Sequence, residues 1–180
     1  MRIQAQQSLL LVVDLQGRLL PAIHEHEAIL AEAGWLVDVA QTLSVPVVAT
    51  EHCPQRIGLT EDTLRQRFAA DCIVEKTHFS AVGDGLLQHP AAAGRSQWVV
   101  VGTEAHVCVQ QTVLDLLAAG QEVFVVEEAV GSRRPRDKQL ALARMQRNGA
   151  EIVSREMAAF EWLEDANHPM FRDILARFIR

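Results

Sequence analysis

Three side chains that could act together in catalysis stand after short apolar segments of the chain: Asp14, Lys76 and Cys108. Asp14 directly follows the almost continuous apolar run of residues 8–13. A carboxylate can accept a proton, an ammonium group can stabilise negative charge, and a thiol that has lost its proton can attack a carbonyl carbon. A carboxylate at the tip of a buried strand is costly unless it is paired, so we expect Asp14 to have a partner.

Each of these residues also has an ordinary structural explanation. A single cysteine after a strand is usually a small buried apolar residue, as Cys108 could be. Asp14 could form an Asx turn or a helix cap, and Lys76 could be a solvated loop lysine. Their joint position after strands of one sheet favours the catalytic interpretation.

The sequence alternates between short apolar runs and helical patterns, which predicts an α/β fold made of βαβ units with a mostly parallel sheet. The predicted strands are residues 8–13, 45–50, 71–75, 97–101, 122–126 and 151–153. The predicted helices are residues 21–43, 60–68, 107–119 and 135–148, followed by amphipathic stretches at 155–164 and 169–179. Open α/β sheets bind ligands beyond the carboxyl ends of their strands, so this edge is where we expect the site.

Cys108 falls at the predicted start of a helix, after a strand that ends at Gly102. A helix N-terminus favours a thiolate through the helix dipole and through free N–H groups, which could also receive an oxyanion. We therefore expect Cys108 to react readily with an alkylating reagent near neutral pH.

Composition narrows the class of protein. The 180 residues, 49% hydrophobic and 22% charged, are typical of a single globular domain that spans residues 1–180. The net charge of −6 disfavours nucleic acid and anionic membranes as partners.

Only three cysteines are present and no pair has C-x-x-C spacing, which predicts a reducing, cytoplasmic compartment. The absence of tyrosine leaves proton transfer to a carboxylate or a histidine.

Three segments of the chain resemble the signature segments of the isochorismatase-like cysteine hydrolases. They are residues 11–16 (LVVDLQ), 75–81 (EKTHFSA) and 102–109 (GTEAHVCV). The resemblance runs nearly the full chain, and four further segments look most like the isochorismatase domain-containing subgroup: residues 50–52, 132–133, 142–145 and 168–171.

The resemblance implies a six-stranded sheet in the order 3-2-1-4-5-6, a three-layer α/β/α and Rossmann-like arrangement. It also implies a catalytic triad of Asp14, Lys76 and Cys108. A cis peptide between Thr103 and Glu104 and an oxyanion hole from the backbone N–H groups of Glu104 and Cys108 are further expectations from the family. The candidate pocket residues are Gln16, Glu51, His52, Phe79 and His106.

The residues and the resemblance together predict a metal-independent hydrolase of a small amide or related carbonyl compound, acting through a thioester. The metal-binding spacing of the nicotinamidase branch is absent around Glu51 and His52, and no cofactor motif is present, so we expect neither metal nor cofactor. The partners we expect are a small-molecule substrate and further copies of the chain. Two alternatives stay open: isochorismatase-type ether hydrolysis, and a catalytically silent binding protein of this fold.

Overall fold

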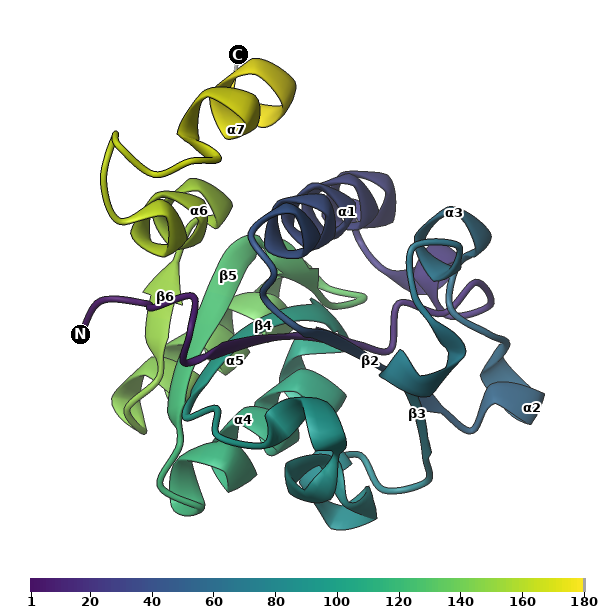
Figure 1. Ribbon diagram of the computed structural model, residues 1–180. Helices are drawn as coiled ribbons and strands as arrows, with labels where there is room; N and C mark the ends of the chain where they lie inside the picture. Colours follow the sequence, from purple (N-terminus) through teal and green to yellow (C-terminus); the bar gives the residue numbers. More distant parts are fainter. Residues whose placement is uncertain (180) are drawn as a thin grey trace.

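A six-stranded sheet, parallel throughout, organises the computed structural model, which describes residues 1–179 (Figure 1). The strands are β1 (Ser8–Val13), β2 (Val47–His52), β3 (Ile73–Lys76), β4 (Gln97–Thr103), β5 (Glu122–Gly131) and β6 (Glu151–Val153). Their order is β3-β2-β1-β4-β5-β6, which confirms the predicted order. The chain reverses its direction of progress between β1 and β4, so the switch point lies beside the end of β1.

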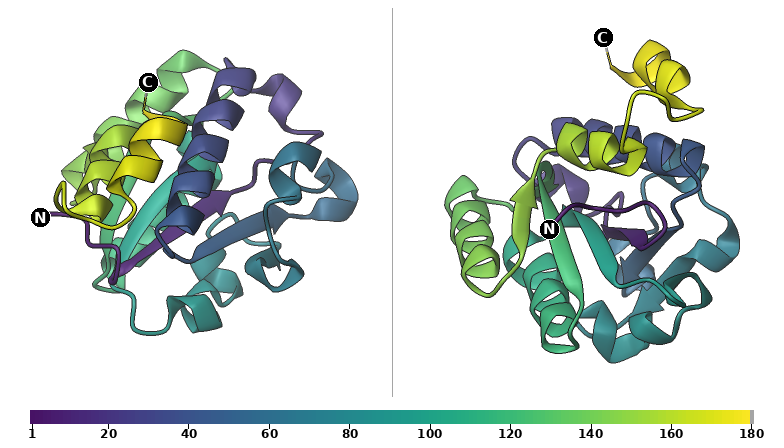
Figure 2. Two further views of the ribbon diagram at one scale, coloured as in Figure 1. Left: turned by 45° about the horizontal axis from the view of Figure 1, so that its top comes forward. Right: turned by 60° about the vertical axis from the view of Figure 1, so that its left-hand side comes forward.

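Helices cover both faces of the sheet (Figures 1 and 2). On one face lie α1 (His26–Thr42), α6 (Arg155–Leu163) and α7 (Phe171–Phe178), and on the other lie α4 (Gln110–Ala118) and α5 (Pro135–Arg147). Short helices α2 (Pro54–Ile57) and α3 (Asp62–Arg65) follow β2. Single 3-10 turns occupy Leu20–Ala22, Ala70–Cys72, Ala81–Asp84, Leu86–Gln88 and Pro90–Ala92. Within residues 1–179, no helix is long and apolar enough to cross a membrane.

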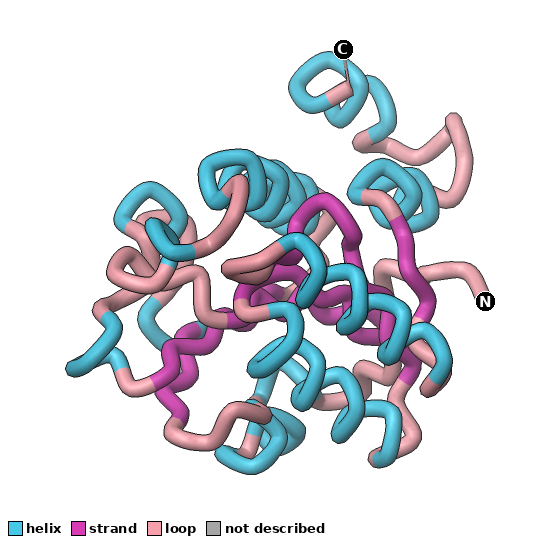
Figure 3. Tube along the Cα trace, turned by 180° about the vertical axis from the view of Figure 1, so that it is seen from behind, coloured by secondary structure: helices cyan, strands magenta, loops and turns pink. Residues whose placement is uncertain are grey.

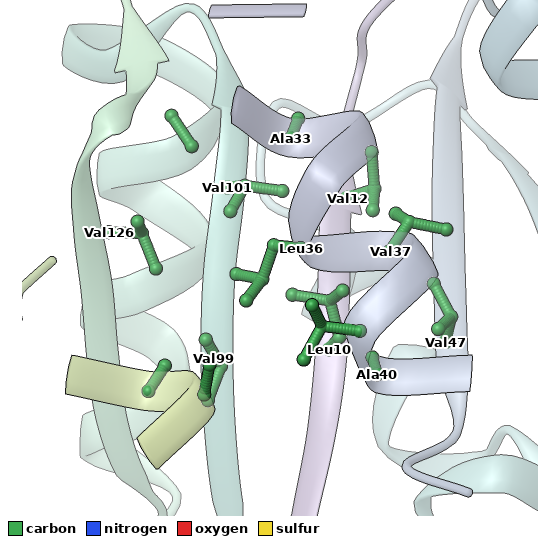
Figure 4. Close-up of a cluster of buried hydrophobic side chains, with 14 of the residues drawn as sticks. Leu10, Val12, Ala33, Leu36, Val37, Ala40, Val47, Val99, Val101 and Val126 are labelled. Atoms are coloured by element: carbon green, nitrogen blue, oxygen red, sulfur yellow. The ribbon is translucent and has the colours of Figure 1, made fainter. Parts of the chain in front are cut away.

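The two faces of the sheet bury separate sets of apolar side chains, because successive residues of a strand point to opposite faces. Leu10 and Val12 of β1 pack on the α1 side, whereas Leu9 and Leu11 pack on the α4 side. Figure 4 shows the first set, in which Leu36 of α1 lies over the strands. Figure 3, seen from behind, shows helices on both sides of the strands. The sheet is therefore covered by helices on both faces.

Several strand boundaries differ from the predicted ones. β2 begins at Val47 because Pro46 has no N–H and pairs only through its carbonyl, which accepts from Leu10 N at 2.9 Å. Asp71 and Cys72 lie in a 3-10 turn before β3 and are not part of the strand. β5 continues to Gly131, five residues beyond the predicted end, because a register shift against β4 lets pairing resume.

Candidate active site

Asp14 and Lys76 meet at the carboxyl edge of the sheet. Asp14 directly follows β1, and Lys76 is the last residue of β3. Nζ of Lys76 lies 2.8 Å from Oδ2 of Asp14. Both side chains are fully buried, so each charge is balanced by the other within a low-dielectric environment. The predicted pairing of Asp14 is thus present in the structure.

Two threonines from neighbouring strands hold Asp14 in place. Oγ1 of Thr50 in β2 donates to Oδ1 of Asp14 at 2.6 Å, and Oγ1 of Thr103 in β4 donates to the Asp14 carbonyl at 2.8 Å. Asp14 itself has a φ of 50°, a left-handed conformation that aspartate tolerates better than most residues. Oδ2 accepts no hydrogen bond of regular geometry within residues 1–179 and is left facing Lys76.

Lys76 is fixed by the loop that follows it. Its Nζ donates to the carbonyl oxygens of His78 at 3.2 Å and Phe79 at 3.0 Å, and its third contact is with Asp14. Two of the three N–H donors of this ammonium group therefore have carbonyl acceptors, and Asp14 is its ion-pair partner. The geometry therefore presents Lys76 as a fixed positive charge.

Cys108 lies in a π-helical turn, Ala105–Val109, that precedes α4. The N–H of Val109 donates to the carbonyl of Glu104 at 3.2 Å, which is the five-residue spacing of a π-helix. The predicted helix start at Val107 is therefore wrong, because the chain has already begun to coil at Ala105. Cys108 is buried and lies on the second half of this turn.

The environment of Cys108 disfavours its thiolate. Burial, together with the Asp14 carboxylate, raises the pKa of the Cys108 thiol from 9.0 to about 12, although Lys76 acts in the opposite direction. The expectation that the helix dipole would lower this pKa is wrong, because desolvation of the sulfur is the larger effect. Cys108 is consequently a thiol at neutral pH, and it needs a base to react.

A pocket of about 360 Å³ opens onto Cys108 and Asp14. Its other lining residues are Leu19, His52, Ile57, Phe79, Glu104, Val107 and Arg133. Its walls are mainly apolar, and the rings of His52 and Phe79 face each other with centroids 5.5 Å apart. The structure thus places three of the predicted residues (His52, Phe79 and Glu104) in the same pocket as Cys108.

Gln16 and Glu51 do not line this pocket, contrary to the prediction. The Gln16 amide bridges the chain, since its Oε1 accepts from His52 N at 2.8 Å and its Nε2 donates to His52 O and Gly58 O. Glu51 is buried, accepts from the N–H and hydroxyl of Thr60 at 2.7 Å each, and pairs with Arg65. Both side chains are engaged by the segment from His52 at the end of β2 to Arg65 in α3.

His106 lies behind the pocket wall and does not line the pocket. Its Nδ1 is 2.9 Å from Oγ of Ser132 and 3.4 Å from Oε2 of Glu104. Glu104 in turn pairs with Arg133, whose Nε is 2.8 Å from Oε1 of Glu104. His106 therefore contacts a pocket residue without contacting the pocket itself.

The peptide between Thr103 and Glu104 is trans, and residues 1–179 contain no cis peptide bond. The cis peptide expected from the family resemblance is therefore not present. Glu104 has φ −57° and ψ 112°, ordinary torsions that carry the chain from β4 into the π-helical turn.

The donor set near β2 does not fit a metal ion. Within residues 1–179, no three His, Cys, Asp or Glu side chains converge as a metal site requires. Glu51, near the end of β2, already has Thr60 and Arg65 as partners.

Several functional contacts could not be read from local sequence. Thr50 and Thr103 are strand residues whose roles depend on which strands lie beside β1. Leu19, Ile57 and Val107 are apolar residues from three separate segments that meet only at the pocket. For Thr50 and Thr103, the sequence offered one indication of a role at the site, which is their position at or next to the end of a predicted strand.

Comparisons with known proteins show the family and the fold that the chain shares. The isochorismatase domain family matches residues 8–157. Isochorismatase domain-containing protein 2A of Mus musculus is 36% identical over 176 residues, covering 96% of this chain and 83% of the relative.

Two solved structures have the same fold. A structure described as the MAR1 ribonuclease from Caenorhabditis elegans has a TM-score of 0.88 and 33% identity, and the match covers 98% of this chain and 91% of that chain. An octameric hydrolase of unknown specificity from Escherichia coli has a TM-score of 0.86 with 98% and 95% covered, and at 23% identity it supports the fold alone. From the family match and the similarity to the mouse protein, the resemblance of the three sequence segments is confirmed, and the chain belongs to the isochorismatase family.

Proposed function

We propose that the chain is a cysteine hydrolase that cleaves a small amide or a related carbonyl compound through a thioester intermediate. One observation carries this proposal: Asp14, whose carboxylate is paired with the buried Lys76, lines the same pocket as Cys108. The membership of the chain in the isochorismatase family supports the same class of reaction.

In the first half of the reaction, Asp14 accepts the thiol proton as the sulfur of Cys108 attacks the carbonyl carbon of the substrate. A C–S bond forms, and the carbonyl oxygen becomes an oxyanion. The oxyanion then collapses, the C–N bond breaks, and Asp14 returns the proton to the departing amine. The products of this half are a thioester on Cys108 and ammonia or an amine.

In the second half, water attacks the thioester carbonyl while Asp14 accepts a proton from that water. The C–S bond breaks, and the sulfur takes the proton back, which regenerates the thiol and releases a carboxylic acid. Asp14 is suited to both steps because its Oδ2 accepts no regular hydrogen bond in the described structure. Lys76 stays protonated throughout and stabilises the negative charge that passes between the carboxylate and the sulfur.

The raised pKa of Cys108 is consistent with this order of events. A sulfur with a pKa of about 12 attacks only when its proton leaves at the same time, which is the role assigned to Asp14. The backbone N–H groups of Glu104 and Cys108 are our proposal for the oxyanion hole. The pocket of about 360 Å³ restricts the substrate to a small molecule with an apolar part.

The test is a panel of small amides, with ammonia release measured for the wild type and for Cys108→Ser. We expect turnover in the wild type, retention of that turnover in the presence of EDTA, and loss in Cys108→Ser. Cys53→Ser is the matched control, because Cys53 does not line the pocket and its loss should leave turnover unchanged. Turnover of an amide that survives in Cys108→Ser would overturn the proposal.

Two other readings would give different results. Ether hydrolysis of the isochorismatase type would release product from a vinyl ether in Cys108→Ser as well as in the wild type. A silent binding protein would bind ligands and hydrolyse none of the panel. The intact Asp14, Lys76 and Cys108 arrangement favours the hydrolase.

A ribonuclease activity is named for the C. elegans structure but is disfavoured for this chain. A net charge of −6 does not attract a polyanion, and the pocket walls are apolar. RNA cleavage that Cys108→Ser leaves intact would indicate an activity unrelated to the proposed one.

We also propose a cytoplasmic homo-oligomer. The octameric state named for the E. coli relative supports assembly, and the free cysteines of this chain are compatible with a reducing compartment. Size-exclusion chromatography with light scattering tests the assembly, and a monomer would contradict it.

A further inference from the structure

Helix α5 carries a row of basic side chains with an apolar residue at its centre. Arg136, Leu140 and Arg144 are spaced four residues apart, so they form one ridge along the helix, which we call the basic ridge. All three residues are exposed, Leu140 by 52%. Within residues 1–179, neither arginine side chain has an ion pair or a hydrogen bond. The basic ridge is thus an unpartnered positive surface on a chain whose net charge is −6.

Helix α6 has the opposite charges at the same spacing. Glu156, Phe160 and the C-cap residue Glu164 also follow one another at intervals of four residues and form an acidic ridge. All three are exposed, Phe160 by 40%, and Glu156 has no side-chain partner in the part of the chain that the structure describes. Glu164 lies 3.8 Å from Arg2, but both of these side chains are largely exposed, so their pair contributes little.

The dipoles of the two helices do not account for these charges. The N-terminus of a helix favours acidic side chains, and the C-terminus favours basic ones. Arg136 is in the first turn of α5, and Glu164 caps the C-terminal end of α6, so each stands at the end where its own helix disfavours it. A facing surface of opposite charge compensates both positions.

The two ridges belong to opposite faces of the sheet, so they do not meet within one chain. Ala141 and Met145 of α5 are buried on one face, and Ala158 and Ala159 of α6 are buried on the other. Figures 1 and 2 show the two helices on opposite sides of the strands. β6, the outermost strand at this end of the sheet, connects α5 to α6. A two-fold axis along this edge places α6 of a second copy beside α5 and its α5 beside α6, so the contact forms twice.

We propose that the basic ridge of α5 binds the acidic ridge of α6 in a second copy of the chain. Leu140 then packs against Phe160 of the second copy, and a glutamate faces an arginine on either side of this apolar contact. The equal spacing permits this match whether the two helices run parallel or antiparallel. The inference gives the proposed homo-oligomer an interface and rests on that part of the proposed function.

Charge reversal in two complementary variants tests the contact. Arg136→Glu/Arg144→Glu makes both ridges acidic, and Glu156→Lys/Glu164→Lys makes both ridges basic. For each variant alone, like charges meet, so the dissociation constant for self-association should rise about 100-fold or more in sedimentation velocity. In an equimolar mixture of the two variants, every ridge again finds one of opposite charge, and assembly should return.

Two further sets of variants control for net charge and for folding. Arg18→Glu/Arg56→Glu changes the net charge as much as the arginine reversal does, but alters exposed residues outside both ridges, so it should leave assembly unchanged. Arg136→Glu alone and Glu164→Lys alone should each weaken assembly. Each replaces a charge that its helix dipole disfavours with one that the dipole favours, so circular dichroism should show no loss of helix.

The outcomes separate this proposal from the others. A monomeric wild type would overturn it together with the homo-oligomer. If the wild type assembles and the reversed variants assemble equally well, or if their mixture stays dissociated, the interface is overturned and the homo-oligomer stands. Amide turnover is measured separately, and its absence would overturn the hydrolase proposal alone.

Discussion

Nζ of Lys76 lies 2.8 Å from Oδ2 of Asp14, and neither side chain is exposed to solvent. The pair joins the end of β3 to the end of β1 across the intervening β2. Each buried charge is tolerated because its partner is buried with it, so the fold needs both members of the pair.

Lys76→Met should lower the free energy of unfolding by about 3–5 kcal/mol, because it leaves the Asp14 carboxylate buried without its cation. Chemical denaturation at neutral pH measures the change. The double variant Asp14→Asn/Lys76→Met should lose less than the sum of the two single variants, since both charges are then absent. Arg177→Met is the control: its pair with Asp173 is exposed, and its loss should cost less than about 1 kcal/mol. If Lys76→Met lowers the free energy of unfolding by no more than Arg177→Met does, the prediction is contradicted.

Thr50→Val should lower both stability and turnover, because it removes the hydroxyl that donates to Oδ1 of Asp14 at 2.6 Å. The expected loss is about 1.5–3 kcal/mol, the range for a hydrogen bond to a charged group. Thermal denaturation and amide turnover are the two measurements. Thr42→Val removes a helical hydroxyl bonded to a carbonyl, so it should cost less and leave turnover unchanged. Full turnover in Thr50→Val would show that Asp14 is oriented without this hydroxyl.

Iodoacetamide should label Cys108 more slowly than Cys53 at neutral pH. Burial and the Asp14 carboxylate raise the pKa of Cys108 from 9.0 to about 12. This lowers its thiolate fraction about 1,000-fold relative to a thiol of ordinary pKa. Asp14→Asn removes the proposed proton acceptor and leaves the burial of the sulfur in place, so Cys108 should stay slow to label while turnover falls. Mass spectrometry of peptides follows each cysteine, and preferential labelling of Cys108 in the wild type would contradict the raised pKa.

The same shift makes stability depend on alkaline pH. The folded chain keeps the Cys108 proton up to a pKa of about 12, whereas the unfolded chain loses it near 9.0. The contribution of the Cys108 thiol to the free energy of unfolding is therefore intact below pH 9. Above pH 9 it falls by roughly 1.4 kcal/mol per pH unit, until the thiol of the folded chain also ionises. Cys108→Ala lacks this group, so the difference in free energy of unfolding between wild type and variant should decline over that window. A constant difference would show that Cys108 has an ordinary pKa.

Gly102→Ala should destabilise the chain by at least about 4 kcal/mol, because the new side chain adds backbone strain at a positive φ and its Cβ overlaps a neighbouring strand. Gly102 has a φ of 127°, and a Cβ there would overlap the carbonyl of Val13, the residue before Asp14. Gly94→Ala is the matched control: its φ is 72°, but a Cβ there meets no atom within 4 Å. Denaturation of both variants tests the prediction, which fails if Gly102→Ala costs no more than Gly94→Ala.

The elements of the fold follow from local patterns in the sequence. The strands at Ser8–Val13 and Glu151–Val153 have the predicted bounds, because each is a short apolar run between polar residues. The order of the strands came from the family resemblance, since no local pattern states which strands are neighbours. β5 was predicted too short because Glu127 and Glu128 interrupt its apolar run, and its continuation depends on pairing with β4.

By itself, the sequence predicted a mostly parallel sheet, the edge at which a site would form and the candidate residues Asp14, Lys76 and Cys108, which the family resemblance assigned to a triad. Only the tertiary structure decided that Gln16 and Glu51 bind the segment from His52 to Thr60 and do not line the pocket. It also decided that Cys108 is held as a thiol. The physical reason is common to these cases: burial and hydrogen-bond partners come from residues far apart in the chain, so the state of a side chain depends on its neighbours in space.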